Sequence, residues 1–449
     1  MTSLPADLAL VLLSVAAFTA AGELVLGRRS RDLVAGNDSF LSGLAVAAAA
    51  LFPLSILFRG AALSIELGLL GIALLAAVAR RVPGRRPLPP RAPAASDPWT
   101  TLALSGVLVA AFCFTLLDLR HNLFWDGLLI WASRAQVLFH EGFLGRSWYP
   151  DDAYELRHLT YPPLVPLSEA LFLRLRGRFD FDLIKPVFLP FYFSLLVSIY
   201  GGIRAVASPR RAMTATLLLA FLGPLATRHA AGGYADMPQA AFVAGVVGAA
   251  LRRRAGEDAL PWLVGGLTTV KAEGTVLAAI AVIAALATRW LERARPPASS
   301  RRPARALAIV GGFFLVRFVY LRWLGVVDPV YVPLDAAHLP EALRRIPHVA
   351  RTCLAKALVP RRWGLLWPAF AASALVLLRR GRGLERAVAV ATGAAAVLLA
   401  APFLVTTWPL DLQIDQAYPR LLEQLAPAAV AVAVLGWIRA GSPAAAPDR

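Results

Sequence analysis

Residues 39–58 read SFLSGLAVAAAALFPLSILF, and residues 61–79 follow them as AALSIELGLLGIALLAAVA. Each run is apolar over about 20 residues, which is the length that an α-helix needs to cross the hydrocarbon core of a bilayer. Only one side chain in the two runs, that of Glu66, is ionisable. Because a bilayer accepts only helices or closed barrels, this stretch predicts an all-α protein that crosses a membrane repeatedly.

The rest of the chain has the same apolar character. Of its 449 residues, 58% are hydrophobic and 16% are charged, and its mean hydropathy is +0.62. Soluble domains carry about 25% charged residues. The composition therefore excludes a soluble enzyme, a disordered chain and a fibrous repeat, and it indicates a polytopic protein of the cell membrane.

Apolar runs of helix length recur along the chain and predict about thirteen membrane crossings. They lie near residues 6–26, 39–58, 61–79, 100–119, 184–203, 212–228, 236–251, 259–270, 272–288, 306–324, 363–378, 387–406 and 423–438. The runs at 259–270 and 272–288 are short for full spans, since a span takes about 20 residues.

The formal net charge of +18 comes from short arginine clusters between the apolar runs. A basic chain can bind nucleic acid, but this distribution fits the positive-inside rule of membrane proteins better, so we expect membrane lipids and no nucleic acid as partners. Placing the clusters in the cytoplasm puts the N-terminus outside and the C-terminus inside. Three loops then share the outer face, at residues 120–182, 325–362 and 407–422.

The longest of these loops, 120–182, opens with Phe-Trp-Asp-Gly at residues 124–127. Apolar residues then recur at helical spacing as far as Glu141, and Gly142 should end the helix, which we expect to lie in the membrane interface. Asp126 stands where it could act in catalysis or as the N-cap of this helix. Arg134 is a polar residue of the same helix.

The loop closes with His-Leu-Thr-Tyr-Pro-Pro-Leu at residues 158–164, followed by a second short helix over 164–175. His158 and Tyr161 are candidate site residues in this turn. Taken singly, His158 reads as a solvated loop residue and Tyr161 as an aromatic anchor at the membrane interface.

Two further outer turns carry polar groups next to apolar helices. Residues 234–238 read Tyr-Ala-Asp-Met-Pro, and residues 271–274 read Lys-Ala-Glu-Gly. Asp236 could cap a helix. Placing the charged side chains of Lys271 and Glu273 close to the membrane interior costs free energy. The two residues are therefore either functional or paired with each other. The last outer loop carries Arg420 ahead of a final helix.

These turns, in this order, resemble those of the GT-C fold membrane glycosyltransferases. The closest likeness is to bacterial members of glycosyltransferase family 39, relatives of protein mannosyltransferases and of lipid A aminoarabinose transferases. The matching pieces are Trp125-Asp126 with Trp131, residues 161–164, residues 234–238 and residues 271–274. The resemblance covers roughly residues 100–325. The single acid at Asp126 departs from the adjacent Asp-Glu pair of the protein mannosyltransferases.

The resemblance implies a seven-helix catalytic module at residues 100–325 with the outer loop 120–182. A three-helix membrane extension with a basic, proline-rich cytoplasmic linker would precede it at 1–99, and a C-terminal membrane region would follow at 326–449. It also implies a hexosyl- or pentosyltransferase on the outer face of the membrane. The donor would be a polyprenyl-phosphate-linked sugar, and the acceptor a lipid, a glycan or a protein.

The resemblance also implies roles for the candidate residues. A positioned carboxylate can take the proton of the acceptor hydroxyl, and Asp126 is the expected base. Cations stabilise the leaving phosphate, with Lys271 first, then Arg420 and Arg134. Asp236 would orient the acceptor or a divalent cation, the one cofactor left open. The other expected substrate-binding residues are Glu273, His158 and Tyr161. Single displacement would invert the anomeric carbon.

Two other functions compete with this one. A multi-pass transporter also buries charges, but these usually lie near the middle of the membrane and between repeated halves. A lipid-linked glycan ligase or polymerase uses related donors and a large outer loop.

Overall fold

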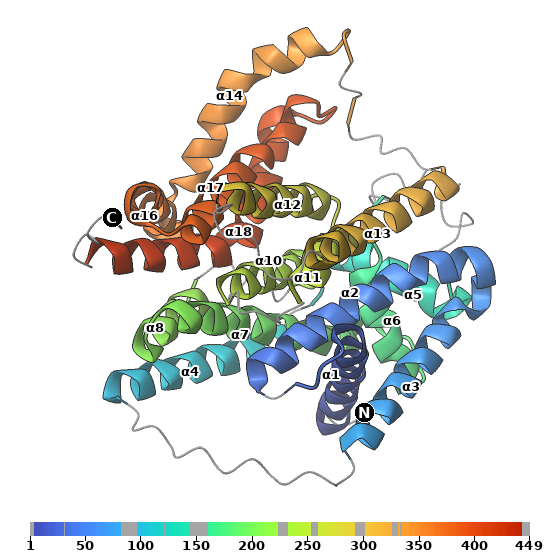
Figure 1. Ribbon diagram of the computed structural model, residues 1–449. Helices are drawn as coiled ribbons and strands as arrows, with labels where there is room; N and C mark the ends of the chain where they lie inside the picture. Colours follow the sequence, from blue (N-terminus) through green and yellow to red (C-terminus); the bar gives the residue numbers. More distant parts are fainter. Residues whose placement is uncertain are drawn as a thin grey trace.

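The computed structural model describes residues 4–30, 32–81, 97–120, 122–143, 160–222, 232–252, 259–291, 301–325, 331–332 and 335–441. Within these ranges the regular structure is helical, and the sole β-type pairing is an isolated bridge between Tyr331 and Thr406. The predicted all-α class is therefore confirmed (Figure 1).

The N-terminal helices are α1 (Leu4–Leu26), α2 (Leu33–Phe58), the short turn η1 (Arg59–Ala61), α3 (Ala62–Arg81) and α4 (Pro98–Arg120). Asp32 starts α2, since its carboxylate accepts a hydrogen bond from the Ala35 amide at 2.8 Å. Helix α2 does not stand apart from the rest of the bundle. It packs on α1 and α3 and also on α7, α11 and α13 (Figure 1).

The first long loop contains η2 (Gly127–Ala132), α5 (Ser133–Glu141), α6 (Leu164–Arg176), η5 (Phe181–Leu183) and η6 (Lys185–Phe188). The predicted end at Gly142 is confirmed. This residue has a φ of +80°, which glycine adopts at little cost, and a Cβ here would lie 2.1 Å from the Gly60 carbonyl oxygen. The predicted short helix over 164–175 is confirmed as α6.

The central helices are α7 (Leu189–Val206), α8 (Pro209–Ala220), α10 (Asp236–Leu251), α11 (Ala259–Val270), α12 (Gly274–Leu291) and α13 (Arg301–Leu324). The C-terminal elements are α14 (Leu339–Ala357), α15 (Pro360–Trp363), α16 (Leu366–Arg380), α17 (Gly383–Leu398), η7 (Ala401–Leu404) and α18 (Leu410–Ala440). Helix α18 packs on α10 and α16, so the last helix of the chain lies against the centre of the bundle (Figure 1).

Seven stretches of the described chain are long and apolar enough to cross a membrane. They are Pro5–Leu26, Leu33–Arg81, Pro98–Arg120, Phe181–Val206, Ala304–Leu324, Gly383–Leu404 and Leu410–Ala440. The second stretch contains both α2 and α3, and three shorter apolar helices begin at Asp236, Ala259 and Gly274. The chain is thus a multi-pass membrane protein, while the count of thirteen crossings stays a prediction.

Two segments expected to be outer loops contain helices that the sequence pattern did not indicate, while their place on the outer face stays a prediction. Helix α14 lies within 325–362, and α18 begins at Leu410, inside the expected loop 407–422. Pro347 in α14 and Pro419 in α18 resemble helix breakers in the sequence. The two helices hold each other through contacts of His348 with Asp411 and of Lys356 with Asp415, at 2.6 and 2.7 Å.

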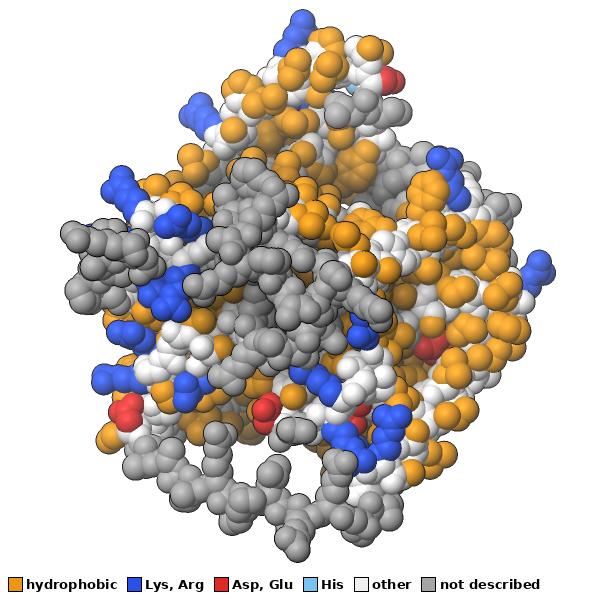
Figure 2. Space-filling view, viewed as in Figure 1, with side chains coloured by type: hydrophobic (Ala, Val, Ile, Leu, Met, Phe, Trp, Pro, Cys, Tyr) orange, Lys and Arg blue, Asp and Glu red, His pale blue; other side chains and the backbone are white. Residues whose placement is uncertain are grey.

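Basic side chains gather at particular helix ends. Figure 2 shows many Lys and Arg side chains over the region of α8 and α16. Arg210 and Arg211 lie in the first turn of α8, and Arg379 and Arg380 in the last turn of α16. This gathering of positive charge at helix ends is the structural form of the arginine clusters seen in the sequence.

Candidate functional site

Five charged side chains from four separate parts of the chain meet at one end of α10. We call Asp126, Asp236, Lys271, Glu273 and Arg420 the charge cluster. Asp236 is the first residue of α10, and Asp126 directly precedes η2. Lys271 and Glu273 form the turn between α11 and α12, while Arg420 lies on α18.

Asp236 is the centre of the charge cluster. Its carboxylate contacts Lys271 Nζ at 2.9 Å, Arg420 Nη2 at 2.9 Å and Gln424 Nε2 at 2.7 Å. The side chain is only 2% exposed. Two cations and an amide therefore compensate a carboxylate that would be costly to bury alone.

Lys271 lies between two acids. Its Nζ is also 2.7 Å from Glu273 Oε1, and the side chain is 5% exposed. Burial lowers the pKa of Lys271, but Asp236 and Glu273 raise it by more, so it ends above its ordinary value. Burial raises the pKa of Glu273, but Lys271 brings it below its ordinary value. Both groups are therefore charged near neutral pH, and the Lys271–Glu273 pair expected as an alternative is present.

Arg420 joins the first long loop to α10. Its Nη2 lies 2.6 Å from Asp126 Oδ2 and 2.9 Å from Asp236 Oδ2. The guanidinium carbon lies 4.4 Å from the ring centroid of Tyr234, a favourable cation–π distance. Since Arg420 comes from the C-terminal region, the cluster extends beyond residues 100–325.

Asp126 is the most exposed acid of the charge cluster. Its side chain is 28% exposed, against 2% for Asp236. Its side chain makes no capping hydrogen bond to η2, so the alternative that Asp126 is only an N-cap is wrong. Asp236 is not a cap either, because it lies within α10 and Ala235 precedes the helix. Asp126 is the carboxylate that an incoming molecule could reach.

Aromatic rings and Arg134 form one wall beside the charge cluster. The Trp131 ring stacks on Tyr161 with centroids 5.3 Å apart, and Lys271 Nζ lies 5.9 Å from the Tyr161 centroid. Arg134 is fully buried and donates from Nη1 to the Tyr161 carbonyl at 2.5 Å. Burial, together with the carboxylates of Glu273 and Asp126, raises the pKa of Tyr161 well above its ordinary value, so its phenol stays neutral.

The structure adds two polar residues that sequence reasoning missed. Gln424 donates from Nε2 to both Asp236 and Glu273. Arg317 of α13 donates from Nη1 to the Thr268 carbonyl at 2.8 Å and to Thr275 Oγ1 at 2.7 Å, which holds the turn that carries Lys271. An arginine within the apolar run 306–324 was a signal for Arg317, because a charge in a span is usually functional or paired.

Two further predictions concern His158 and a divalent cation. His158 lies outside the described residues. Among the residues that the structure describes, no group of three His, Cys, Asp or Glu side chains could hold a metal ion. Asp126 and Asp236 share Arg420 instead. This donor set does not fit a divalent cation.

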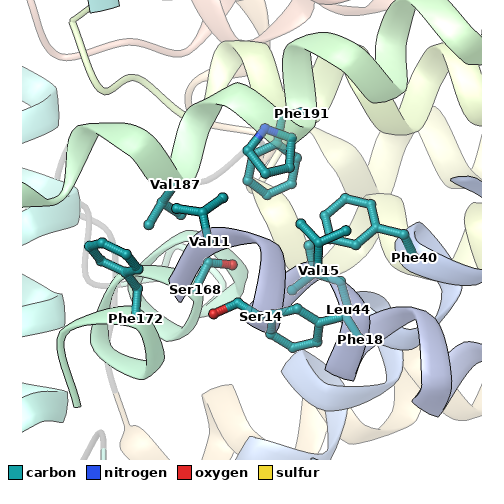
Figure 3. A pocket seen from close by; sticks show the side chains of 11 residues that line it. Val11, Ser14, Val15, Phe18, Phe40, Leu44, Ser168, Phe172, Val187 and Phe191 are labelled. Atoms are coloured by element: carbon teal, nitrogen blue, oxygen red, sulfur yellow. The ribbon is translucent and has the colours of Figure 1, made fainter. Parts of the chain in front are cut away.

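Two hollows lie away from the charge cluster. A cavity of about 20 Å³ among α1, α2, α6 and α7 is lined by apolar side chains such as Phe18, Phe40 and Phe172, with Ser14 and Ser168 (Figure 3). It has room for about one water molecule. A larger apolar groove of about 270 Å³ lies among α10, α11, α12, α13 and α17.

No protein-family model, curated protein or solved structure matches the chain.

Proposed function

We propose that the protein is an integral membrane glycosyltransferase of the GT-C type. It would move a sugar from a polyprenyl-phosphate donor to a lipid, glycan or protein acceptor. The observation that carries the proposal is the convergence of Asp126, Asp236 and Arg420, which lie far apart in the sequence, at the start of the apolar helix α10. The residues expected from the sequence resemblance thus meet, except for His158, which lies outside the described part of the chain.

The position of the charge cluster along the helices favours this function over transport. Asp236 begins α10, and Lys271 and Glu273 occupy a turn between two apolar helices. A lipid phosphate has its charge at the membrane boundary, which is where helix ends lie. Transporter sites lie near the bilayer midplane, commonly at interruptions within spans.

The same geometry supports a site on the outer face. Helix α10 has the charge cluster at its start and Arg252 just after its end, and α18 has Arg420 on its first half and Arg439 in its last turn. Arginine-rich ends face the cytoplasm by the positive-inside rule. The opposite ends, which carry the cluster, would then face outward in a cell membrane, as the proposed topology requires.

In the proposed reaction, Asp126 accepts the proton of the acceptor hydroxyl as that oxygen bonds to the anomeric carbon. The bond between the anomeric carbon and the phosphate oxygen breaks, and its electron pair leaves with the phosphate. A single displacement of this kind inverts the anomeric carbon. Arg420 would compensate the charge that develops on the leaving phosphate.

The contacts change the expected order of the cations. Lys271 is held between Asp236 and Glu273, and Arg134 is fully buried against the Tyr161 carbonyl. Arg420 is more exposed than Lys271, so we place it first among the phosphate ligands. A phosphate on Arg420 would also compete with Asp126 for Nη2. Donor binding would then release the Asp126 carboxylate from its ion pair and leave it available to the acceptor hydroxyl.

The test is transfer of radiolabel in membranes that contain the protein. Vesicles are supplied with polyprenyl-monophosphate sugars, and label is followed into lipid, glycan and protein fractions, with Asp126→Asn as the matched control. We expect covalent transfer that the variant lacks. Transfer from diphosphate-linked oligosaccharides alone would favour a ligase or polymerase. Accumulation of free sugar inside sealed vesicles without a covalent product would favour a transporter.

A further inference from the structure

Helix α14 has two apolar stripes, and the described part of the chain covers only one. The covered stripe packs against α18 and η7 and consists of Ala342, Val349, Cys353 and Ala357. The other stripe is open, with exposed fractions between 44% and 60%. This open stripe consists of Leu339, Leu343, Ile346, Leu354 and, at the C-cap, Leu358.

The two stripes lie next to each other around α14, because each residue advances about 100° around a helix. Together they make one side of the helix apolar, and the polar residues occupy the other. Arg345 of the polar side pairs with Glu341 and donates to the Thr406 carbonyl. His348 and Lys356 contact acids of α18. These contacts fasten α14 to the protein without using the open stripe.

Two arginines border the open stripe on its polar side. Arg344 and Arg351 are exposed and lie seven residues apart, which is about two helical turns. Neither makes an ion pair or a hydrogen bond with any residue that the structure describes. The one acid within α14, Glu341, is paired with Arg345. The rim of the stripe is therefore positively charged.

Helix α14 contacts the first turns of α18, the helix that also carries Arg420 of the charge cluster. Its partners Asp411 and Asp415 lie in the first turns of α18. Arg420 follows Asp411 by nine residues, or about 14 Å along the helix. Figure 1 shows α14 reaching outward from the bundle beside α18. Helix α14 is thus attached to α18 on the N-terminal side of Arg420.

We propose that α14 lies in the surface of the bilayer and binds the phosphate groups of anionic phospholipids. The open stripe enters the boundary of the acyl chains, as expected for a strongly amphipathic helix. Arg344 and Arg351 extend along this boundary and reach the phosphates, since arginine side chains can bury their stems and keep the charge in the polar layer. The positively charged rim favours an anionic lipid surface over a second copy of this chain. The proposal does not depend on the reaction that the charge cluster performs.

The first test places a nitroxide on α14 of the full-length protein in nanodiscs of phosphatidylcholine and phosphatidylglycerol. The background carries Cys113→Ser and Cys353→Ala. Labels go to Leu343→Cys and Leu354→Cys on the open stripe and, as the matched control, to Ala355→Cys on the polar side. We expect the stripe labels to be relaxed by oxygen and the control label by a water-soluble nickel chelate.

Two outcomes would overturn the lipid contact. If the stripe labels are as accessible to the nickel chelate as the label at residue 355, the helix lies in water. If both reagents are excluded and dipolar coupling appears between copies, a second chain covers the stripe.

The second test concerns the two arginines. Each should raise the local preference for phosphatidylglycerol over phosphatidylcholine by about fivefold. The double variant Arg344→Glu and Arg351→Glu should lose this preference, measured with spin-labelled lipids, whereas the matched lysine double variant should keep it. An unchanged preference in the glutamate variant, with unchanged thermal unfolding, would show that the arginines do not contact lipid phosphates.

Discussion

The two ends of α10 both hold buried ion pairs, but the surroundings of the pairs differ. At the far end, Asp38 accepts hydrogen bonds from Arg252 at 2.7 and 2.8 Å, and both side chains are nearly inaccessible. Close helix contacts surround this pair, since a Cβ on Gly248 would lie 2.5 Å from the Ser198 carbonyl oxygen. At the near end, Asp236 is equally buried, but Arg420 and Asp126 are partly open.

This difference in exposure distinguishes an ion pair that only joins helices from a cluster that can also bind a ligand. The Asp38–Arg252 pair joins α2 to the end of α10 and leaves no exposed carboxylate. The charge cluster joins α10 to α18, but its chain of contacts ends at Asp126, which is 28% exposed. Matched substitutions at the two ends should therefore change different properties.

The largest effect is expected from Asp126→Asn. A general base contributes typically 10²–10⁴-fold to a rate, and asparagine cannot accept the proton. Arg420 keeps Asp236 as a partner, so the variant should fold and unfold like the wild type. The measurement is label transfer per folded molecule. Near-full transfer, combined with loss of expression in Asp126→Ala, would make the residue structural and direct the search for the base to Asp236.

The matched change at the other end, Asp38→Asn, should act on stability. Removing one partner of a buried ion pair leaves an uncompensated charge and costs about 3–5 kcal/mol. We expect a lower midpoint of thermal unfolding in detergent and less protein in the membrane, with unchanged transfer per folded molecule. If transfer falls while the unfolding midpoint is unchanged, the contrast between the two ends is wrong.

A smaller effect should distinguish two roles of Lys271, pairing with Glu273 and contact with the donor phosphate. Lys271→Ala leaves Glu273 with the Gln424 amide but without its cation, so the protein should lose stability. The double variant with Glu273→Ala should recover much of that loss, which thermal unfolding can measure. Recovery of stability without recovery of transfer supports a contact between Lys271 and the donor phosphate. Recovery of both would limit Lys271 to pairing.

The smallest effect concerns pH. The pKa of Glu273 is lowered in the folded protein, so its ionised form adds stability above the ordinary carboxyl pKa of about 4.3, and this stability is lost as the pH falls through the folded value. The pKa of Lys271 is raised, so its contribution persists below about 10.4 and is lost above the folded value. The wild type should therefore lose more stability than Glu273→Gln between about pH 5 and pH 3. Parallel unfolding curves of the two proteins over that range would argue against the ion pair.

The apolar runs were the strongest predictors of structure, because burial in lipid selects long apolar helices locally. The helix end at Gly142 and the short helix over 164–175 were also predicted from local sequence signals. Helix α14 and the first turns of α18 were missed because their polar residues and internal prolines resemble loops. Contacts between the two helices, such as that of Lys356 with Asp415, cannot be recognised from a local sequence pattern.

For the candidate site, the sequence by itself determined which residues to examine. Asp126, Asp236 and Lys271 are charges beside apolar runs, and such charges are costly unless they are used or paired. The tertiary structure decided how they are used. Arg420 lies 184 residues from Asp236 along the chain, and the packing of α18 on α10 brings their side chains within 2.9 Å. A local sequence pattern shows that a charged residue lies next to an apolar run, where its burial costs free energy. Only helix packing determines which distant charge compensates it.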